Sequence, residues 1–283
     1  MTNEELTAVH AYIGALKTRF RNKINPEEYA LSYSGGKDSH FLLMFIKEIL
    51  KDDRIVIVGV NTGFEIPEIR NRILKHSDVV LHPAMYRYDI KEQFGIPCFT
   101  KHSDEYIYRY QHGSRTYNTM RYINGENPKM NLSKKARELL LSGKLHPVSS
   151  KCCLYNKERP LMKWQKANGK RAIMGVRGAE SIQRKAVYSQ CLTSKGNFTP
   201  LFDWTDRIMD LAYEWYEWEI PKVYNFVERT GCAGCPYGRH IETELSLLPE
   251  LQRKASIRFF KESYDVLGVD YNNIQTTMYQ GEK

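Results

Sequence analysis

The 283-residue chain lacks several features that would assign its class at once. No apolar run reaches membrane-spanning length, and the acidic start Met-Thr-Asn-Glu-Glu differs from the basic and then apolar start of a secretory signal. No internal repeat stands out, and no Gly-x-x-x-x-Gly-Lys-Ser/Thr string is present, which excludes a Walker A loop. The sequence therefore predicts a cytoplasmic globular protein that does not span a membrane.

Cysteine is scarce, and acidic residues are outnumbered. In a reducing compartment the six cysteines are expected to be metal ligands, catalytic thiols or core residues and not disulfides. The chain has 42 Lys and Arg against 33 Asp and Glu, a net charge of +9. This excess of positive charge favours an anionic partner, either a nucleotide or a nucleic acid. The oligomeric state cannot be read from these numbers.

The stretch at residues 34–39 has the features of a phosphate cradle between a strand and a helix. An apolar run at 29–33 precedes it, and apolar residues at helical spacing follow from Phe41 to Ile49. Two glycines allow a sharp turn and close approach to an anion, and the amides of the first helical turn would point at that anion. A solvated Ser-Gly turn is the simpler alternative.

The string Ser34-Gly35-Gly36-Lys37-Asp38-Ser39 resembles the PP-loop of the ATP pyrophosphatase and phosphoadenosine phosphosulfate (PAPS) reductase family, in the adenine nucleotide alpha hydrolase superfamily. The resemblance implies that these residues bind ATP with Mg²⁺, or a sulfonucleotide. It also implies chemistry at the α-phosphate, with pyrophosphate as the leaving group. Lys37 would then stabilise the charge that grows on the phosphate oxygens.

Strand and helix patterns alternate through the first part of the chain. Buried strands are predicted at 29–33, 54–60, 79–82 and 171–176, with helices at 4–24 and 67–76. This alternation predicts an α/β fold with a doubly wound, mostly parallel sheet. We expect a nucleotide-binding domain at 1–200 and a helical, cysteine-bearing region at 201–283, with the ligand at the loops that follow Tyr33 and Val60.

The segment that begins Asn61-Thr62-Gly63 is similar to the Asp-Thr-Gly … Pro-Glu-Thr segment of sulfonucleotide reductases, which implies contacts with the nucleotide. Two positions depart from that pattern, because Asn61 replaces Asp and Ile69 replaces Thr. A glycine turn followed by a helix that starts at Pro67 explains the same residues without a ligand.

Residues 86–150 are rich in tyrosine and in basic side chains. Aromatic rings interleaved with cations are typical of surfaces that bind single-stranded nucleic acid, by stacking bases and neutralising phosphates. The alternative, which we favour at this stage, is a helical insertion whose tyrosines are half-buried with wet hydroxyls.

A second group of residues runs from Lys151-Cys152-Cys153 through Lys157 to Arg177 and Arg184. It is similar to the Cys-Cys … Lys … Pro-Leu … Gly-x-Arg … Ser … Arg segment of the same reductase family and its sulfur-transferring relatives. The resemblance implies that both arginines contact the nucleotide or substrate anion, and an arginine fork suits phosphate or sulfate. Two surface arginines bridged by Glu180 are the alternative.

The pair Cys232 and Cys235 forms a CxxC motif, 79 positions after Cys153. With Cys152 and Cys153 it supplies four thiols, as in the cluster-containing adenylyl-sulfate reductases, and these suit a [4Fe-4S] cluster or Zn²⁺. Adjacent cysteines fit a zinc knuckle poorly, so we favour the cluster; reduced loop thiols without metal remain the alternative. Cys191 would replace Cys152 as a ligand or carry sulfur, and Cys98 is expected to be a buried or loop thiol.

The chain has no cysteine after Cys235, whereas sulfonucleotide reductases use a cysteine near the C-terminus as their nucleophile. The pattern therefore favours the sulfur-transferring side of the family, such as the PP-loop subunit of DNA phosphorothioation systems. By that resemblance, a substrate is adenylated by ATP, and sulfur from the cluster or from a cysteine persulfide then displaces AMP. A sulfur donor such as a cysteine desulfurase and a nucleic-acid acceptor are the implied partners. A reductase that releases sulfite, and a non-catalytic nucleic-acid-binding subunit with a structural metal, are the alternatives.

Overall fold

The computed structural model describes residues 1–127, 130–180, 182–275 and 277. The chain forms two compact units from interleaved segments. Unit 1 comprises Met1–Asn61, Glu68–Leu81 and Leu161–Asn225, and unit 2 comprises Thr62–Pro67, His82–Pro160 and Phe226–Lys283. The division at residue 200 that the sequence suggests cuts through unit 1, so it is not the division made by packing, and as a statement about domains it stays a prediction.

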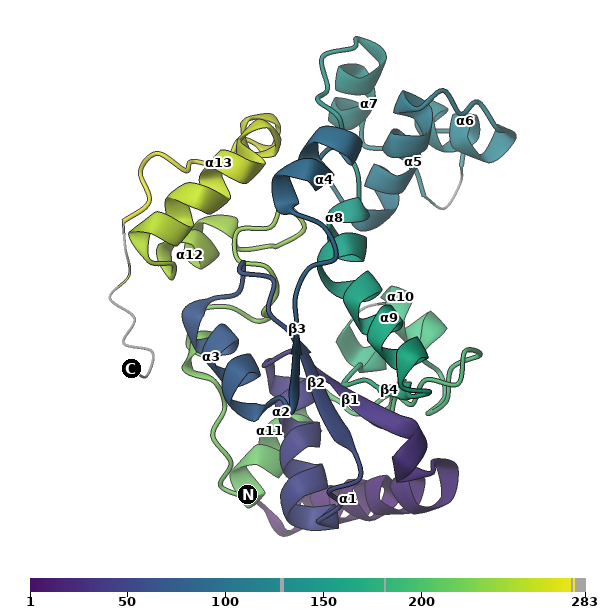
Figure 1. The fold of residues 1–283 in the computed structure, drawn as a ribbon, viewed down its shortest axis with the longest axis vertical. Coiled ribbons are helices and arrows are strands. Elements are labelled where there is room, and N and C mark those ends of the chain that lie inside the picture. The colour runs from purple at the N-terminus through teal and green to yellow at the C-terminus, as the bar shows by residue number, and fades with distance from the viewer. Residues whose placement is uncertain (128–129, 181, 276, 278–283) are drawn as a thin grey trace. The chain divides into compact units, whose positions relative to one another are not determined.

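Unit 1 contains a four-stranded, all-parallel sheet in the order β3-β2-β1-β4 (Figure 1). Its strands are β1 (Tyr29–Tyr33), β2 (Val56–Val60), β3 (Val79–Leu81) and β4 (Arg171–Ile173). Leu31 at the centre of β1 pairs with Ile57 of β2 on one side and with Ile173 of β4 on the other. Helices flank the sheet, which confirms the predicted α/β class with a doubly wound, parallel sheet.

The helices of unit 1 follow the apolar spacing of the sequence. α1 begins with a capping box, in which the Glu5 amide donates to Thr2 Oγ1 and the Thr2 amide donates to Glu5 Oε2. The helices and helical turns are α1 (Asn3–Lys23), η1 (Pro26–Glu28), α2 (Lys37–Met44), η2 (Phe45–Leu50), α3 (Pro67–His76), α9 (Arg159–Ala167), η4 (Gly178–Glu180), α10 (Ile182–Val187), α11 (Asp206–Trp215) and η5 (Lys222–Asn225).

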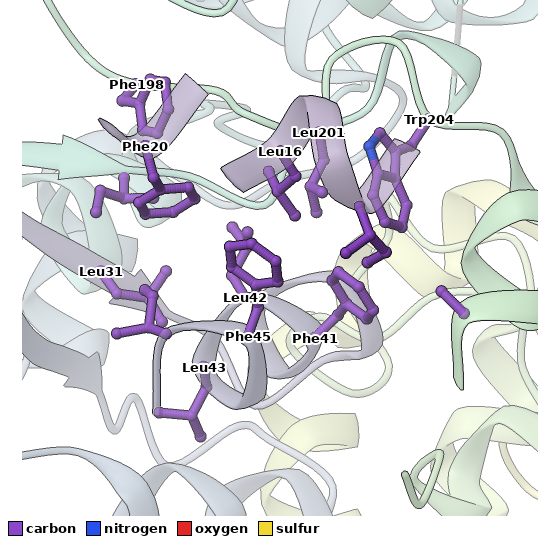
Figure 2. Close-up of a cluster of buried hydrophobic side chains, with 14 of the residues drawn as sticks. Leu16, Phe20, Leu31, Phe41, Leu42, Leu43, Phe45, Phe198, Leu201 and Trp204 are labelled. Atoms are coloured by element: carbon purple, nitrogen blue, oxygen red, sulfur yellow. The ribbon is translucent and has the colours of Figure 1, made fainter. Parts of the chain in front are cut away.

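One hydrophobic core holds α1, β1, α2 and α11 together. Figure 2 shows Leu16 and Phe20 of α1 above Phe41 of α2 and Phe45 of η2, with Trp204 at one end of the cluster. These side chains are almost fully buried, so the strand before residues 34–39 and the helix after them are both fixed in the core. The intervening loop is therefore presented by rigid elements.

Unit 2 is helical in its described part. Its helices are α4 (Arg87–Phe94), α5 (Lys101–Gln111), α6 (Tyr117–Asn124), α7 (Lys134–Leu141), α8 (Lys151–Cys153), η3 (Leu154–Glu158), α12 (Ile241–Ser246) and α13 (Glu250–Leu267). α5, α6 and α7 share a small core around Ile107, Ile123 and Leu140. Residues 86–150 are therefore largely helical, although their periodicity is weak.

One strand is shorter than the sequence suggests, since the strand expected at 171–176 ends at Ile173. On its other edge, Ile173 forms an isolated parallel bridge with Phe198, in which the Met174 amide donates to the Phe198 carbonyl. Near the C-terminal end, α12 and α13 are separate helices, and Pro249 is the N-cap residue of α13. Within the described ranges, no helix combines the length and the apolar character needed to cross a bilayer.

Candidate functional site

The strand order creates a place for a ligand in unit 1. From β1 the chain moves to β2 and β3 on one side, and β4 later joins β1 on the other side, so the order switches between β1 and β4. Ligands in open parallel sheets bind at the carboxyl ends of strands at such a switch point. The loop after β4 touches the loop after β1, since a Cβ on Gly175 would lie 2.9 Å from the carbonyl carbon of Asp38.

Residues 34–39 form a tight turn into α2, as their sequence predicts. Gly35 has a φ of +75°, and a Cβ there would lie 2.7 Å from the carbonyl oxygen of Ile69, so this position requires glycine. Ser39 Oγ accepts from the Ser34 amide and donates to the Gly36 carbonyl. The N-cap residue Gly36 provides no side-chain cap, which leaves the positive end of α2 to other acceptors.

Arg177 is the buried cation of this site. Its Nε lies 3.0 Å from Asp38 Oδ1, and its Nη2 donates to Asp206 Oδ1 at 2.8 Å. Although only 4% of the side chain is exposed, Nη1 has no hydrogen-bond partner among the described residues. A buried guanidinium donor without an acceptor is costly, and an anion at the loop would satisfy it.

The carboxylates around Arg177 respond to it differently. Burial raises the pKa of Asp38, although the nearby Arg177 opposes that rise. A hydrogen bond from Arg177 lowers the pKa of Asp206. The site therefore holds one partly buried carboxyl group that is costly to ionise, Asp38, and one exposed carboxylate that is not, Asp206.

Lys37, the first residue of α2, is held by residues that the sequence analysis did not single out as site residues. Its ammonium forms an ion pair with Asp210 at 3.2 Å, and its amide donates to the Tyr224 hydroxyl at 2.8 Å. The Tyr213 hydroxyl donates to its carbonyl at 2.7 Å. These partners lie more than 170 positions along the chain, so no local sequence signal indicates them.

Arg184 pairs with Glu180. The same carboxylate accepts from the amide of Arg177, not from its guanidinium. The alternative of two surface arginines bridged by Glu180 is therefore wrong for Arg177, which is buried, and describes Arg184 well. Contact of Arg184 with a nucleotide stays a prediction.

Residues 61–63, which are predicted to contact the nucleotide, are divided between the two units. The Asn61 amide, in unit 1, donates to the carbonyl of Leu81 at 2.9 Å. In unit 2, Thr62 is buried, and its amide and hydroxyl both donate to Glu65. Gly63 has a φ of +76°. Thr62 thus has a structural role in this loop, and nucleotide contact by these residues stays a prediction.

Unit 2 gathers the four cysteines that the sequence proposes as ligands. Burial raises the pKa of Cys152, Cys153 and Cys235, and the neighbouring thiols of the same set raise it further. Such mutual effects require the sulfurs to lie close enough to act electrostatically on one another. The structure therefore brings together Cys152-Cys153 and the distant CxxC pair.

Polar groups surround these sulfurs. The Asn156 amide lies 3.0 Å from Cys152 Sγ, and Thr62 Oγ1 lies 3.9 Å from Cys232 Sγ. The charge of Cys232 raises the pKa of Lys157, against the effect of burial. A cation and hydrogen-bond donors beside sulfur stabilise thiolates, so the donor set fits a thiolate-bound metal by its chemistry.

The CxxC loop is built on a glycine. Gly234 has a φ of +71°, and its amide donates to Glu244 Oε2 at 2.8 Å. In the described part of the chain, no three His, Cys, Asp or Glu side chains are arranged to hold a metal ion. The structure thus supports a gathering of thiol donors, and a formed coordination shell stays a prediction.

The two remaining cysteines lie elsewhere. Cys191 is in unit 1, half-buried against the hydrophobic core, and its part in ligation or sulfur transfer stays a prediction. Cys98 is fully buried in unit 2, and burial raises its pKa to about 12. Cys98 is therefore an inert core thiol, which agrees with the expectation of a buried or loop thiol.

The tyrosine-rich segment divides between core and surface. Tyr122 is buried and stacks on Tyr106 at 4.3 Å, as a helical insertion requires. Tyr117, in contrast, is 75% exposed and lies beside Arg121, while the Arg115 guanidinium covers the ring of Tyr110 at 3.8 Å. The segment has both the packing tyrosines and the exposed cation–aromatic pairs that the two interpretations describe.

Comparison of the chain with protein-family models and with curated proteins gives no match. The functional assignment therefore depends on the motifs and on the geometry of the two units.

Proposed function

We propose that this protein is a PP-loop enzyme that activates a substrate with ATP and then transfers sulfur to it. The observation that carries the proposal is Arg177, whose buried Nη1 lacks an acceptor beside the loop at residues 34–39. The loop supplies helix-end amides and Lys37, and the strand order places both at the switch point of the sheet. Together these donors suit the phosphates of a nucleotide.

In the first step, an oxygen of the substrate attacks the α-phosphorus of magnesium ATP. A bond between that oxygen and phosphorus forms, the bond from phosphorus to the bridging oxygen breaks, and pyrophosphate leaves. Lys37 and Arg177 neutralise the charge that develops on the phosphate oxygens. In the second step, sulfide attacks the activated atom of the substrate and AMP leaves with its oxygen.

The thiol cluster of unit 2 supports sulfur as the second reactant. Cys152, Cys153, Cys232 and Cys235 would hold a [4Fe-4S] cluster, or alternatively Zn²⁺, once deprotonated. When bound, such a cluster would supply sulfur at the sulfide level. Lys157 beside Cys232 lowers the cost of the thiolate charges, and Asn156 beside Cys152 offers one hydrogen bond to sulfur.

A nucleic acid is the acceptor that we propose. Residues 101–151 contain ten Lys and Arg against four Asp and Glu, so this segment carries a net charge of +6 out of the +9 of the chain. Arg115 hydrogen-bonds to carbonyl oxygens and to no carboxylate, among the contacts described, and lies over an aromatic ring. Exposed cations beside aromatic faces suit single-stranded phosphates and bases.

The nucleotide assignment is tested by equilibrium binding of ATP to Arg177→Gln and Lys37→Ala variants. We expect each variant to lose about 10-fold or more in affinity, because a charge-assisted hydrogen bond to phosphate is lost. Arg171→Gln is the matched control, since Arg171 lies at the opposite end of β4 and is exposed. Equal affinity of all four proteins would contradict the assignment. Lys37→Ala guards against a folding defect, because it leaves no buried carboxylate without its partner.

The sulfur assignment is tested by anaerobic purification followed by iron and acid-labile sulfide analysis and a visible spectrum. We expect about four irons and four sulfides per chain, lost in a Cys232→Ser/Cys235→Ser variant and retained in Cys98→Ser. A colourless protein loaded with zinc would remove the cluster from the proposed mechanism.

The acceptor assignment is tested with a fluorescent single-stranded oligonucleotide. We expect the affinity for the oligonucleotide to fall steeply as the salt concentration rises. The Arg115→Gln variant should bind more weakly than the wild type at each salt concentration. Arg54→Gln is the control, because Arg54 is an exposed arginine of unit 1 that pairs with Asp52. Binding that is independent of salt, or equal in the two variants, would contradict this surface.

A further inference from the structure

We call residues 34–39 the phosphate loop. In the structure, Nη2 of Arg177 and two donors of Lys37 in this loop already have acceptors, and these acceptors come from one stretch of the chain. Asp206 accepts from Arg177, Asp210 pairs with Lys37, and the hydroxyl of Tyr224 accepts from the Lys37 amide. We call these residues the acceptor set. All belong to α11 or η5, in residues 206–224, and all use oxygen atoms, as a phosphate would.

The contact from Tyr224 falls on an amide that an anion at the end of α2 would use. Lys37 is the first residue of that helix, so its amide has no acceptor within the helix and points out of its positive end. The Tyr224 hydroxyl lies 2.8 Å from this nitrogen. A phosphate oxygen and the tyrosine hydroxyl cannot both take that position.

The acceptor set is able to leave the loop. The side chain of Asp210 is 50% exposed and that of Asp206 is 70% exposed, so each carboxylate regains water when its cation turns to another anion. Tyr224 is half-buried. In contrast, Tyr213 is almost fully buried and donates to the Lys37 carbonyl, so it holds the start of α2 without competing for an anion donor.

The base of η5 is anchored independently of the loop. Glu68 of α3 accepts from the amides of Lys222 and Val223 through its two carboxylate oxygens, at 2.8 and 2.9 Å. This anchor is unaffected if the Tyr224 hydroxyl turns away, so displacement of Tyr224 requires a side-chain movement and no unfolding of the turn.

We propose that Tyr224 and Asp210 are built-in competitors that occupy the donors of the phosphate loop until a polyphosphate anion displaces them. They weaken the binding of single phosphates, which gain too few contacts to replace both acceptors, and they select for ligands with several phosphate groups. This inference rests on the proposed nucleotide site and adds a selectivity device to it.

The test compares the binding of pyrophosphate and of orthophosphate, by calorimetry in EDTA, to the full-length wild-type protein and to four variants. We expect Tyr224→Phe to bind both anions about 2- to 10-fold more tightly, because one hydrogen bond no longer has to be broken. Asp210→Asn should tighten binding about 2- to 5-fold. The gain should be larger for orthophosphate than for pyrophosphate.

Two matched variants separate competition from its alternatives. The Tyr213 hydroxyl contacts the carbonyl of Lys37, so Tyr213→Phe removes a contact with the same loop residue without releasing its amide. This variant should therefore not tighten anion binding. Asp203→Asn removes one negative charge near the start of α11, but Asp203 pairs with Arg19 and not with the loop, so the affinity should not change. Equal tightening by Asp203→Asn would show a long-range charge effect and overturn competition by Asp210.

The outcomes distinguish this inference from the proposed function. If the wild type binds pyrophosphate and Tyr224→Phe binds it equally or more weakly, the hydroxyl is a helix cap or a ligand contact, and the competitor role is wrong while the site stands. If neither the wild type nor any variant binds pyrophosphate or ATP, the proposed nucleotide site is wrong, and the inference that rests on it is wrong too.

Discussion

A single buried carboxyl group connects the start of α5 to the loop that follows the CxxC motif. Asp104 accepts from the amides of Cys98 and Phe99 and from the hydroxyl of Tyr237, at 2.7, 3.1 and 2.8 Å. Burial raises its pKa to about 6, although these donors favour the charged form. Because the pKa is raised in the folded state, Asp104 contributes most stability when it is protonated, below the unfolded pKa of about 4, and that contribution is lost as the pH rises to about 6.

We therefore predict that protection of the Cys98 and Phe99 amides from hydrogen exchange decreases between pH 4 and pH 6. After correction for the intrinsic exchange rate, the opening free energy should fall by about 1–3 kcal/mol. Asp104→Asn should remove this pH dependence. Protection that rises with pH in the wild type would show that the hydrogen bonds to the carboxylate outweigh its burial.

The roles of residues that belong to a local sequence motif were predictable from the sequence. The roles of residues whose contacts lie far away along the chain were not. The glycines at 35 and 36 with Lys37 identify a turn, and the spacing of the cysteines suggests two pairs. Nothing near Tyr224 or Asp210 in the sequence indicates a contact with Lys37, because these residues lie 187 and 173 positions further along the chain. Such contacts are consequences of the fold, not of a motif.

At the scale of elements, the phosphate loop depends on one left-handed residue between β1 and α2. We predict that Gly35→Ala lowers the free energy of unfolding of unit 1 by about 1–3 kcal/mol, through backbone strain and contact with Ile69. Gly14→Ala is the matched control: Gly14 lies in α1 with open space around it, so alanine should raise stability by up to about 1 kcal/mol.

Tryptophan fluorescence measures this directly, because all four tryptophans lie in unit 1, at positions 164, 204, 215 and 218. Equal effects of the two substitutions would contradict the strain argument. Helix positions were well predicted where an apolar face coincides with a start signal, which is a capping box in α1 and a proline at the first position of α3. Strand β4 was predicted too long, because the apolar run continues to residue 176 although the strand ends at Ile173.

At the scale of the whole molecule, the two groups of proposed site residues lie in different compact units. Unit 1 carries the phosphate loop with Arg177, and unit 2 carries the four thiols with Lys157. The sequence predicted the sheet, while the set of thiols as a metal site stays a prediction. It did not predict the interleaving of segments, since units that exchange the chain several times leave no boundary in composition. The parallel sheet was predictable because its strands are continuous apolar runs between helices.

The central claim is that ATP is cleaved at its α-phosphate, and the nucleotide products test it most directly. The protein, purified anaerobically, is incubated with magnesium ATP, sulfide and a single-stranded oligonucleotide, and the products are separated by ion-exchange chromatography. We predict AMP and pyrophosphate in equal amounts, and neither product with Lys37→Ala. Formation of ADP and orthophosphate, or the same AMP yield from Lys37→Ala as from the wild type, would contradict the account.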